Sequence, residues 1–232
     1  MTPSDGKPEI LATTGGDFPL HEYRLRQLGR EWTILHAGAV LTAEDESRLL
    51  EVRDNRLPYG VSLWPSSIAL AHEIASRSGD FRGRAVLELG AGTGLPGIVA
   101  ASLGAAVVQT DRDELALSLC RRNGGCNGLD SVAYRLADWA SWNPDATHDW
   151  IIGADILYGE VLLPSIRRIL EACLGPAGRV LIADPFRSTG VRWLEAMEEA
   201  GWSVSLTRWD VGEGAALRSI GVFELTRGGS PG

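Results

Sequence analysis

The sequence predicts an α/β protein with a doubly wound, mostly parallel seven-stranded sheet of the Rossmann-like kind. From residue 84 onward, short apolar runs alternate with amphipathic stretches of helical length, which is the order typical of a parallel sheet. Several of these runs, such as AVLEL and RVLIA, are nearly all apolar, as expected for strands buried on both faces. A glycine-rich turn follows the first run directly, at residues 90–94.

The core elements follow from hydrophobic periodicity. After Gly201, two alternating runs flank the turn-like DVGEGAA, and they predict a closing antiparallel hairpin at the edge of the sheet. The predicted parallel strands are Arg84–Leu89, Ala105–Thr110, Ser131–Ala137, Trp150–Ala154 and Arg179–Ala183, and the predicted helices are Leu95–Leu103, Asp113–Asn123, Leu162–Leu174 and Val191–Glu199.

The chain before residue 84 predicts an appendage with its own elements. EYRLRQL and REWTILH alternate on either side of Gly29 and predict a β-hairpin. Thr42, followed by acidic residues, predicts the start of a helix over residues 42–54. After the loop PYGVSLWPSS, a helix is predicted from Ser66 or Ser67 to about Ser78. Residues 1–18 are rich in Thr, Gly, Pro and Asp and are expected to form a loose, disordered tail.

Composition narrows the class of protein. The 232 residues are 44% hydrophobic and 22% charged, an ordinary globular balance. The net charge of −8 argues against a nucleic-acid-binding surface, and the apolar runs are too short for a membrane span. The three cysteines form no C-x-x-C pair, which indicates free thiols and a reducing, cytoplasmic location. The four histidines have no metal-ligand spacing, so no metal site is expected.

The glycine turn has two interpretations. Gly92, Gly94 and Gly97 match the G-x-G-x-x-G of dinucleotide-binding proteins, whereas Glu88, Gly90, Gly92 and Gly94 match E-x-G-x-G-x-G, a pattern of S-adenosylmethionine enzymes. Both cofactors contain a ribose. Asp111, about 20 residues further on at the end of the next strand, suits the ribose hydroxyls of either.

Two carboxylates favour S-adenosylmethionine. Glu88 ends an apolar strand, and a buried carboxylate needs a partner. That partner is either the methionine amino group of the cofactor or the backbone amides of the turn. Asp138 ends the third strand, where it either accepts a hydrogen bond from the adenine amino group or is a solvated loop residue.

The exit of the fourth strand, DWIIGADILY, carries candidate catalytic residues. Ligands in such folds bind at the carboxyl ends of the strands, and Asp155 and Tyr158 lie there. A carboxylate and a phenol at this position are suited to chemistry. The alternative is an aspartate that caps a helix beside a tyrosine that packs.

These segments, with Leu57–Leu225 around them, resemble the seven-β-strand S-adenosylmethionine-dependent methyltransferases. More narrowly, they resemble the lysine methyltransferase family that includes the enzymes acting on chaperones and on the electron-transfer flavoprotein β-subunit. ADILY matches the family motif D-x-x-Y at Asp155 and Tyr158, and Trp64 matches a tryptophan beside the cofactor. ADPFR is similar to the D-P-x-R of the flavoprotein-directed branch, with Phe186 where that branch has glycine.

The resemblance implies methyl transfer from S-adenosylmethionine to a protein lysine. Another protein side chain or a small molecule is the alternative acceptor. Residues 19–65 would cover the cofactor site, residues 66–227 would form the methyltransferase domain, and residues 228–232 would be a tail. The implied residues are Asp155 and Tyr158 for catalysis, Trp64, Glu88, Gly90, Gly92, Gly94, Asp111, Asp138, Trp139 and Ala154 for the cofactor, and Tyr59, Asp184 and Arg187 for the substrate.

Overall fold

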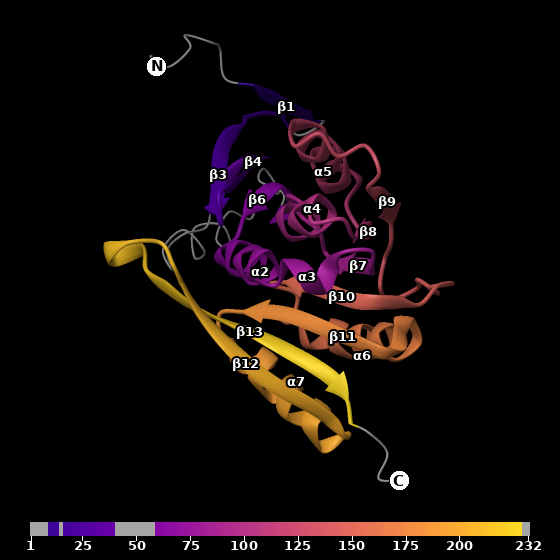
Figure 1. The fold of residues 1–232 in the computed structure, drawn as a ribbon. Coiled ribbons are helices and arrows are strands. Elements are labelled where there is room, and N and C mark those ends of the chain that lie inside the picture. The colour runs from indigo at the N-terminus through magenta and orange to yellow at the C-terminus, as the bar shows by residue number, and fades with distance from the viewer. Residues whose placement is uncertain (1–8, 14–15, 40–58, 229–232) are drawn as a thin grey trace.

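The computed structural model describes residues 9–13, 16–39 and 59–228, so the helix predicted over residues 42–54 lies outside the described residues. Its centre is a seven-stranded sheet in the order β12-β13-β11-β10-β7-β8-β9 (Figure 1). Every neighbouring pair is parallel except those made by β13, which runs antiparallel to both β11 and β12. The predicted doubly wound sheet with a closing antiparallel hairpin is therefore confirmed. The bounds are β7 Ala85–Leu89, β8 Ala106–Asp111, β9 Ala133–Leu136, β10 His148–Ala154, β11 Leu174–Asp184, β12 Trp202–Val211 and β13 Arg218–Arg227.

Helices cover both faces of the sheet (Figure 1). On one face, α2 and α4 pack with Val86, Ile152 and Leu181 of the strands, and α5 packs against β8 and β9. On the other face, α6 and α7 pack against the intervening strand residues, such as Leu87 and Ile151. This arrangement, with helices on both faces, explains why the central strands are nearly all apolar. The bounds are α2 Pro65–Ser76, α3 Ser78–Phe81, α4 Leu95–Ser102, α5 Glu114–Cys126, α6 Leu163–Cys173 and α7 Ser188–Glu199, with a short 3-10 helix η2 at Glu160–Leu162.

The N-terminal hairpin forms as predicted, from β3 (His21–Gln27) and β4 (Arg30–His36). Its buried Leu25, Trp32 and Ile34 join the core on the α2 and α4 side of the sheet. A short 3-10 helix, η1 (Tyr59–Val61), and the paired strands β5 (Gly38–Ala39) and β6 (Ser62–Leu63) then lead to Trp64.

Part of the segment expected to be a loose tail is ordered. The strands β1 (Ile10–Thr13) and β2 (Gly16–Pro19) pair antiparallel. Leu11 and Leu20 are buried with Leu35 and Leu119 in a small separate cluster. Polar composition suggested disorder, but Leu11 and the half-buried Phe18 give this segment apolar surface that packs against the cluster.

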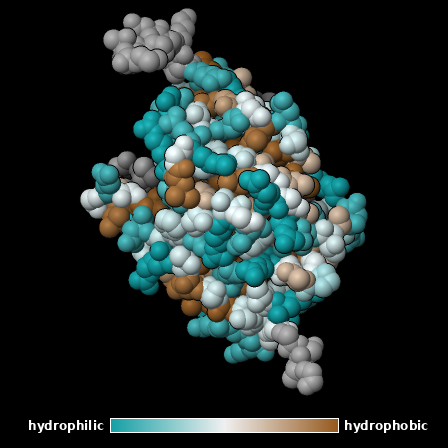
Figure 2. All heavy atoms as spheres, viewed as in Figure 1, coloured by the Kyte–Doolittle hydropathy of each residue, from teal (hydrophilic) through white to brown (hydrophobic). Residues whose placement is uncertain are grey.

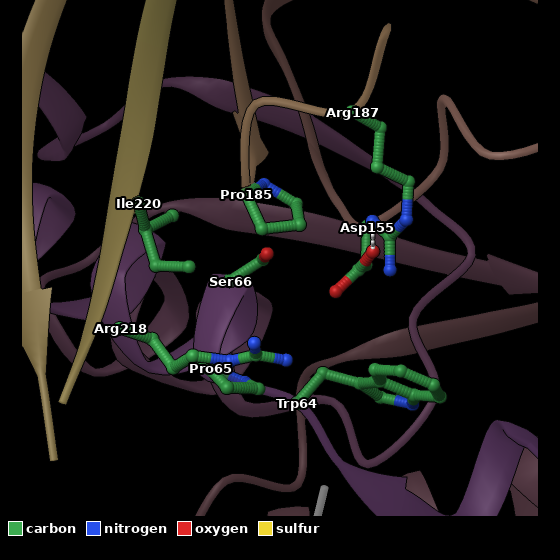
Figure 3. Close-up of a pocket in the computed structure, with 8 residues that line it drawn as sticks. All are labelled: Trp64, Pro65, Ser66, Asp155, Pro185, Arg187, Arg218 and Ile220. Atoms are coloured by element: carbon green, nitrogen blue, oxygen red, sulfur yellow. Dashed lines mark hydrogen bonds and ion pairs between the residues drawn. The ribbon is translucent and has the colours of Figure 1, made fainter. Parts of the chain in front are cut away.

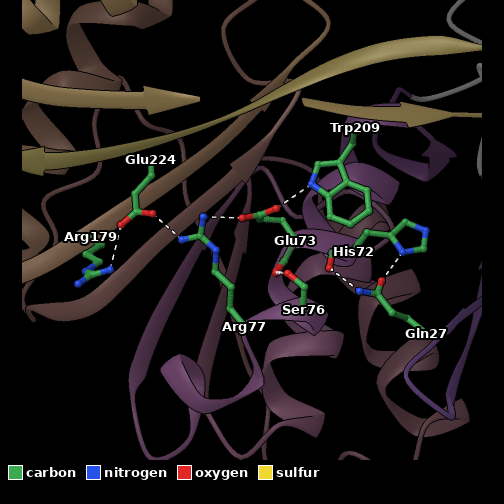
Figure 4. A network of polar contacts seen from close by, with 8 residues as sticks. All are labelled: Gln27, His72, Glu73, Ser76, Arg77, Arg179, Trp209 and Glu224. Atoms are coloured by element: carbon green, nitrogen blue, oxygen red, sulfur yellow. Dashed lines mark hydrogen bonds and ion pairs between the residues drawn. The ribbon is translucent and has the colours of Figure 1, made fainter. Parts of the chain in front are cut away.

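Helix α2 is held between the two hairpins by polar contacts (Figure 4). On one side, Gln27 of β3 donates to the backbone oxygen of His72 at 3.1 Å. On the other side, the indole of Trp209 donates to the carboxylate of Glu73 at 2.7 Å, and Arg77 pairs with Glu224 of β13. These contacts fix the second half of α2 between β3 and the β12–β13 hairpin.

The surface in Figure 2 mixes hydrophilic and apolar residues, with the apolar ones in small groups. Within the described ranges, no helix is long and apolar enough to cross a bilayer. The same part of the chain contains no group of three or more His, Cys, Asp or Glu residues that could hold a metal ion.

Candidate active site

The glycine turn joins β7 to α4 in a left-handed backbone conformation. The φ angles of Gly90, Gly92 and Gly94 are 64°, 57° and 81°. A side chain makes such angles unfavourable, so glycine is required to turn the chain this tightly. The turn lies at the carboxyl end of β7, between the ends of β10 and β8. This is the edge at which open α/β sheets bind their ligands.

Asp111 ends β8 and supports the turn. Its Oδ2 accepts a hydrogen bond from the amide of Gly92 at 3.0 Å, and its Oδ1 accepts one from the amide of Asp113 at 3.0 Å. Burial raises the pKa of this carboxyl above its ordinary value, and the amide hydrogen bonds oppose the rise. The structure therefore fixes the Asp111 carboxylate beside the backbone of the turn.

The side chain of Glu88 points beneath the turn, toward α4. It is 2% exposed, and its Oε2 accepts a hydrogen bond from Nε2 of Gln109 at 2.6 Å. The amide of Gly97 is its second partner, and burial raises the pKa of Glu88 to about 8. These contacts give the buried Glu88 carboxyl hydrogen-bond partners within the fold, on Gln109 and at the start of α4.

The Glu88 carboxyl is expected to make stability depend on pH. Its folded pKa of about 8 lies above the ordinary value of 4.5, so the folded chain binds a proton that the unfolded chain releases. The free energy of unfolding should therefore fall as pH rises through this range. Glu88→Gln keeps the shape and has no proton to lose, so its melting temperature relative to the wild-type protein should rise between about pH 6 and about pH 9. A difference that stays constant with pH would contradict this assignment.

Trp139 lies against the glycine turn. A Cβ placed on Gly90 would come within 3.3 Å of the Trp139 ring and 3.1 Å of Ile156. The neighbouring Asp138 is exposed, and its Oδ1 accepts from the amide of Ala140 at 3.0 Å in a local turn. Ala154, the last residue of β10, is half-buried at the same edge of the sheet.

A small pocket opens beside this edge (Figure 3). Trp64 comes from the loop before α2, and its ring stacks on Tyr59 with centroids 6.3 Å apart. Asp155 follows β10 and Arg187 precedes α7, so three separate segments meet here. Pro65, Ser66, Pro185, Arg218 and Ile220 complete the lining.

The carboxylates of Asp155 and Asp184 hold the guanidinium of Arg187. Nη1 of Arg187 bonds Oδ1 of Asp155 and lies 3.7 Å from Oδ2 of Asp184. The backbone amide of Arg187 donates to Oδ1 of Asp184 at 2.7 Å. Burial raises the pKa of Asp184 to about 6, partly offset by its bonds and attraction to Arg187. Asp184 therefore lies behind the pocket and orients Arg187.

Two residues other than glycine at this site have left-handed backbones. Asp155 has a φ of 59° and Phe186 a φ of 62°. Because the backbone of Phe186 has a positive φ, glycine would also be suited to this position, where the flavoprotein-directed branch has it. Here the ring packs edge-on against Phe223, with centroids 5.8 Å apart, beneath the guanidinium of Arg208 at 5.2 Å.

Tyr158 lies outside the group of residues that line the pocket. Its side chain is 58% exposed, although it follows the same strand as Asp155. Conversely, Arg218 and Ile220 line the pocket, although no pattern in the sequence pointed to them. Their hairpin pairs with β11, whose end carries Asp184, and this long-range pairing brings them to the site.

Fold and site together define a doubly wound α/β protein with a glycine turn and, at the same sheet edge, a pocket that contains Asp155 and Arg187. The chain belongs to the lysine methyltransferase family, whose sequence model matches residues 44–200.

Several curated relatives share this region. The protein N-lysine methyltransferase METTL21A of Xenopus tropicalis is 39% identical over 124 residues, which cover 50% of this chain and 57% of the relative. The EEF1A lysine methyltransferase 3 of Mus musculus is 34% identical over 139 residues, 58% of this chain and 59% of the relative. The histone-arginine methyltransferase METTL23 of Homo sapiens is 34% identical over 156 residues, 64% of this chain and 78% of the relative. The matches to the first two relatives thus span little more than half of their length.

Solved structures share the fold at low identity. The ribosomal protein L11 methylase of Lactobacillus delbrueckii subsp. bulgaricus superposes with a TM-score of 0.55 at 24% identity, covering 70% of this chain and 78% of that one. The DhpI-SAH complex gives a TM-score of 0.53 at 23% identity, covering 71% and 86%.

Proposed function

We propose that this protein is an S-adenosylmethionine-dependent methyltransferase that modifies a lysine side chain of another protein. One observation carries the proposal. In a chain of the lysine methyltransferase family, the left-handed glycine turn and the pocket of Trp64, Asp155 and Arg187 lie at the same edge of the sheet. The proposed cofactor site and the proposed acceptor site would therefore be adjacent.

The turn suits S-adenosylmethionine. The positive φ of Gly92 favours glycine, and the missing side chain lets a ligand approach the backbone closely; the carbonyl oxygen of Gly60 lies 3.4 Å from where a Cβ would be. When bound, S-adenosylmethionine supplies a methyl group activated for displacement. Asp111 would accept hydrogen bonds from its ribose hydroxyls. The other residues that would hold it are Trp64, Gly90, Gly92, Gly94, Asp138, Trp139 and Ala154.

The pocket would orient the acceptor. A lysine must be neutral to attack, and its ordinary pKa is about 10.4. The apolar walls formed by Pro65, Pro185 and Ile220 disfavour the ammonium form. Asp155 favours that form, so its role is to align the amine and to stabilise the cation that forms as the methyl arrives, rather than to act as a base. Arg187 balances part of the Asp155 charge.

Asp111 provides a prediction for the cofactor site. Asp111→Asn retains an oxygen that can accept a hydrogen bond, but it loses the charge that would bind the ribose hydroxyls. A hydrogen bond to a charged group contributes about 1.5–3 kcal/mol, so affinity for S-adenosylhomocysteine should fall roughly tenfold to a hundredfold. Calorimetry checks this, and circular dichroism controls for folding. A loss below about twofold would show that Asp111 only supports the turn.

A second acceptor, arginine, is favoured by a specific observation. Asp155 and Asp184 already hold a guanidinium, that of Arg187, and one relative of this chain is named a histone-arginine methyltransferase. An arginine substrate would take the place of Arg187 between these carboxylates.

The decisive experiment is radiolabelled methyl transfer into a cell lysate, followed by mass spectrometry of the labelled protein. Methyllysine supports the proposal, and methylarginine supports the second acceptor. Label that survives protease treatment in a small molecule contradicts both. We assign the reaction to the cytoplasm, where free thiols such as the exposed Cys126 persist.

A further inference from the structure

A buried asparagine on α5 joins the N-terminal hairpin to the glycine turn. Asn123 is 0% exposed, and its Oδ1 accepts a hydrogen bond from the amide of Leu35 at 2.8 Å. Its Nδ2 donates to the carbonyl of Leu35 at 3.0 Å and to the carbonyl of Thr93 at 2.8 Å. Leu35 lies in β4, and Thr93 lies between Gly92 and Gly94. One side chain thus connects two segments that are distant in the sequence.

Asn127, one helical turn further along, makes the same kind of bond to the hairpin without reaching the glycine turn. Its Oδ1 accepts from the amide of Thr33 at 3.0 Å, and its Nδ2 donates to the carbonyl of Thr33 at 2.7 Å. Thr33 and Leu35 lie on the same edge of β4. The two asparagine amides therefore bond this edge in the way a neighbouring strand would.

The appendage approaches the glycine turn a second time through η1. A Cβ on Gly60 would come within 2.9 Å of Ala116 on α5, so η1 packs closely on that helix. The carbonyl of Gly60 faces Gly92, as described above. The amide of Ala37, just after β4, donates to the carbonyl of Val61 at 2.9 Å and ties η1 to the hairpin.

From these contacts we infer that Asn123 is a positioning residue of the cofactor site and that docking of the N-terminal hairpin is coupled to cofactor binding. The inference rests on the proposed function. Thr93 is 3% exposed, and its carbonyl needs a donor because an unpaired buried polar group is unfavourable. An amide side chain can rotate, and the two bonds to Leu35 fix its Nδ2 toward Thr93. Undocking the hairpin would release Asn123 and loosen the turn.

The test compares two matched variants, Asn123→Leu and Asn127→Leu. Both remove an amide that holds β4, but only the first removes the donor to Thr93. We expect Asn123→Leu to raise the Kd for S-adenosylhomocysteine about tenfold and Asn127→Leu to raise it less than about threefold. Hydrogen exchange of the hairpin amides should accelerate in both variants.

Equal losses of affinity in the two variants would refute the role of Asn123, as would a change below about twofold in Asn123→Leu. Hydrogen exchange of the wild-type protein is a second test that does not depend on either variant folding. Saturating S-adenosylhomocysteine should slow exchange of the Leu35 amide more than it slows the amides of β12 and β13, and equal slowing would refute the coupling. Failure of the wild-type protein to bind S-adenosylhomocysteine would instead refute the proposed function on which the coupling rests.

Discussion

Replacing Asp155 with asparagine is expected to slow methyl transfer about 100-fold or more and to leave affinity for S-adenosylhomocysteine within about threefold. The side chain of Asp155 is 9% exposed and lines the acceptor pocket, where it bonds Arg187. Its negative charge would stabilise the cation that forms on the acceptor. Because that cation exists only as the methyl arrives, loss of the charge should reduce turnover rather than cofactor binding.

Asparagine is the informative replacement because of the backbone. Asp155 has a φ of 59°, a region that aspartate and asparagine tolerate better than most other residues. Its amide also donates to the carbonyl of Ala183 at 2.8 Å, and Asp155→Asn retains this bond. Alanine would add backbone strain to the loss of charge. Single-turnover rates with labelled cofactor, together with calorimetry, separate the two quantities.

Glu160→Gln is the matched control. Glu160, like Asp155, follows β10 and pairs with an arginine of the α7 region: its carboxylate lies 2.7 Å from Arg192. Unlike Asp155, its side chain is 71% exposed. An exposed pair of this kind contributes little to stability, so this variant should react at the wild-type rate. Full turnover in Asp155→Asn, or an equal loss in Glu160→Gln, would contradict the role given to Asp155.

The order of the core elements could be predicted from the sequence because it depends on local patterns. Periodicity identified the five parallel strands and the closing hairpin, and the glycine spacing identified the turn. The position of Asp155 at the exit of a buried strand placed it at the ligand-binding edge. Each of these inferences uses residues close together in the chain.

The details that the sequence did not predict depend on contacts between distant segments. The strand pattern predicted that Glu88 lies beside the turn. That its side chain faces Gln109 and α4 depends on the pairing of β7 with β8 and on the packing of α4. Asn123 and Asn127 lie four residues apart and so share a helix face, which was a usable signal, but their partner β4 precedes them by many residues. Leu11 lies in a mostly polar stretch, so local composition did not indicate that this stretch packs against Leu35 and Leu119.

Adding a single methyl group at Gly97 is expected to destabilise both the fold and the cofactor turn. Gly97 lies in the first turns of α4, where a Cβ would come within 2.3 Å of Oε2 of Glu88 and 2.6 Å of Nε2 of Gln109. Both atoms are buried and bonded to each other, so neither moves freely. Overpacking of this kind typically costs about 1–3 kcal/mol. Gly97→Ala should lower the melting temperature by several degrees and weaken binding of S-adenosylhomocysteine, because α4 begins directly after the glycine turn.

Gly125→Ala is the control, since Gly125 is also helical and a Cβ there would meet nothing within 4 Å. Alanine should stabilise that position by about 0.5–1 kcal/mol through helix propensity alone. The double variant Glu88→Ala with Gly97→Ala tests the cause, because removing the carboxylate makes room for the new methyl group. If the clash with Glu88 is responsible, the two changes should be less harmful together than the sum of their separate effects. Strict additivity, or a Gly97→Ala variant as stable as Gly125→Ala, would show that α4 can move away from β7 and that glycine at position 97 is dispensable for packing.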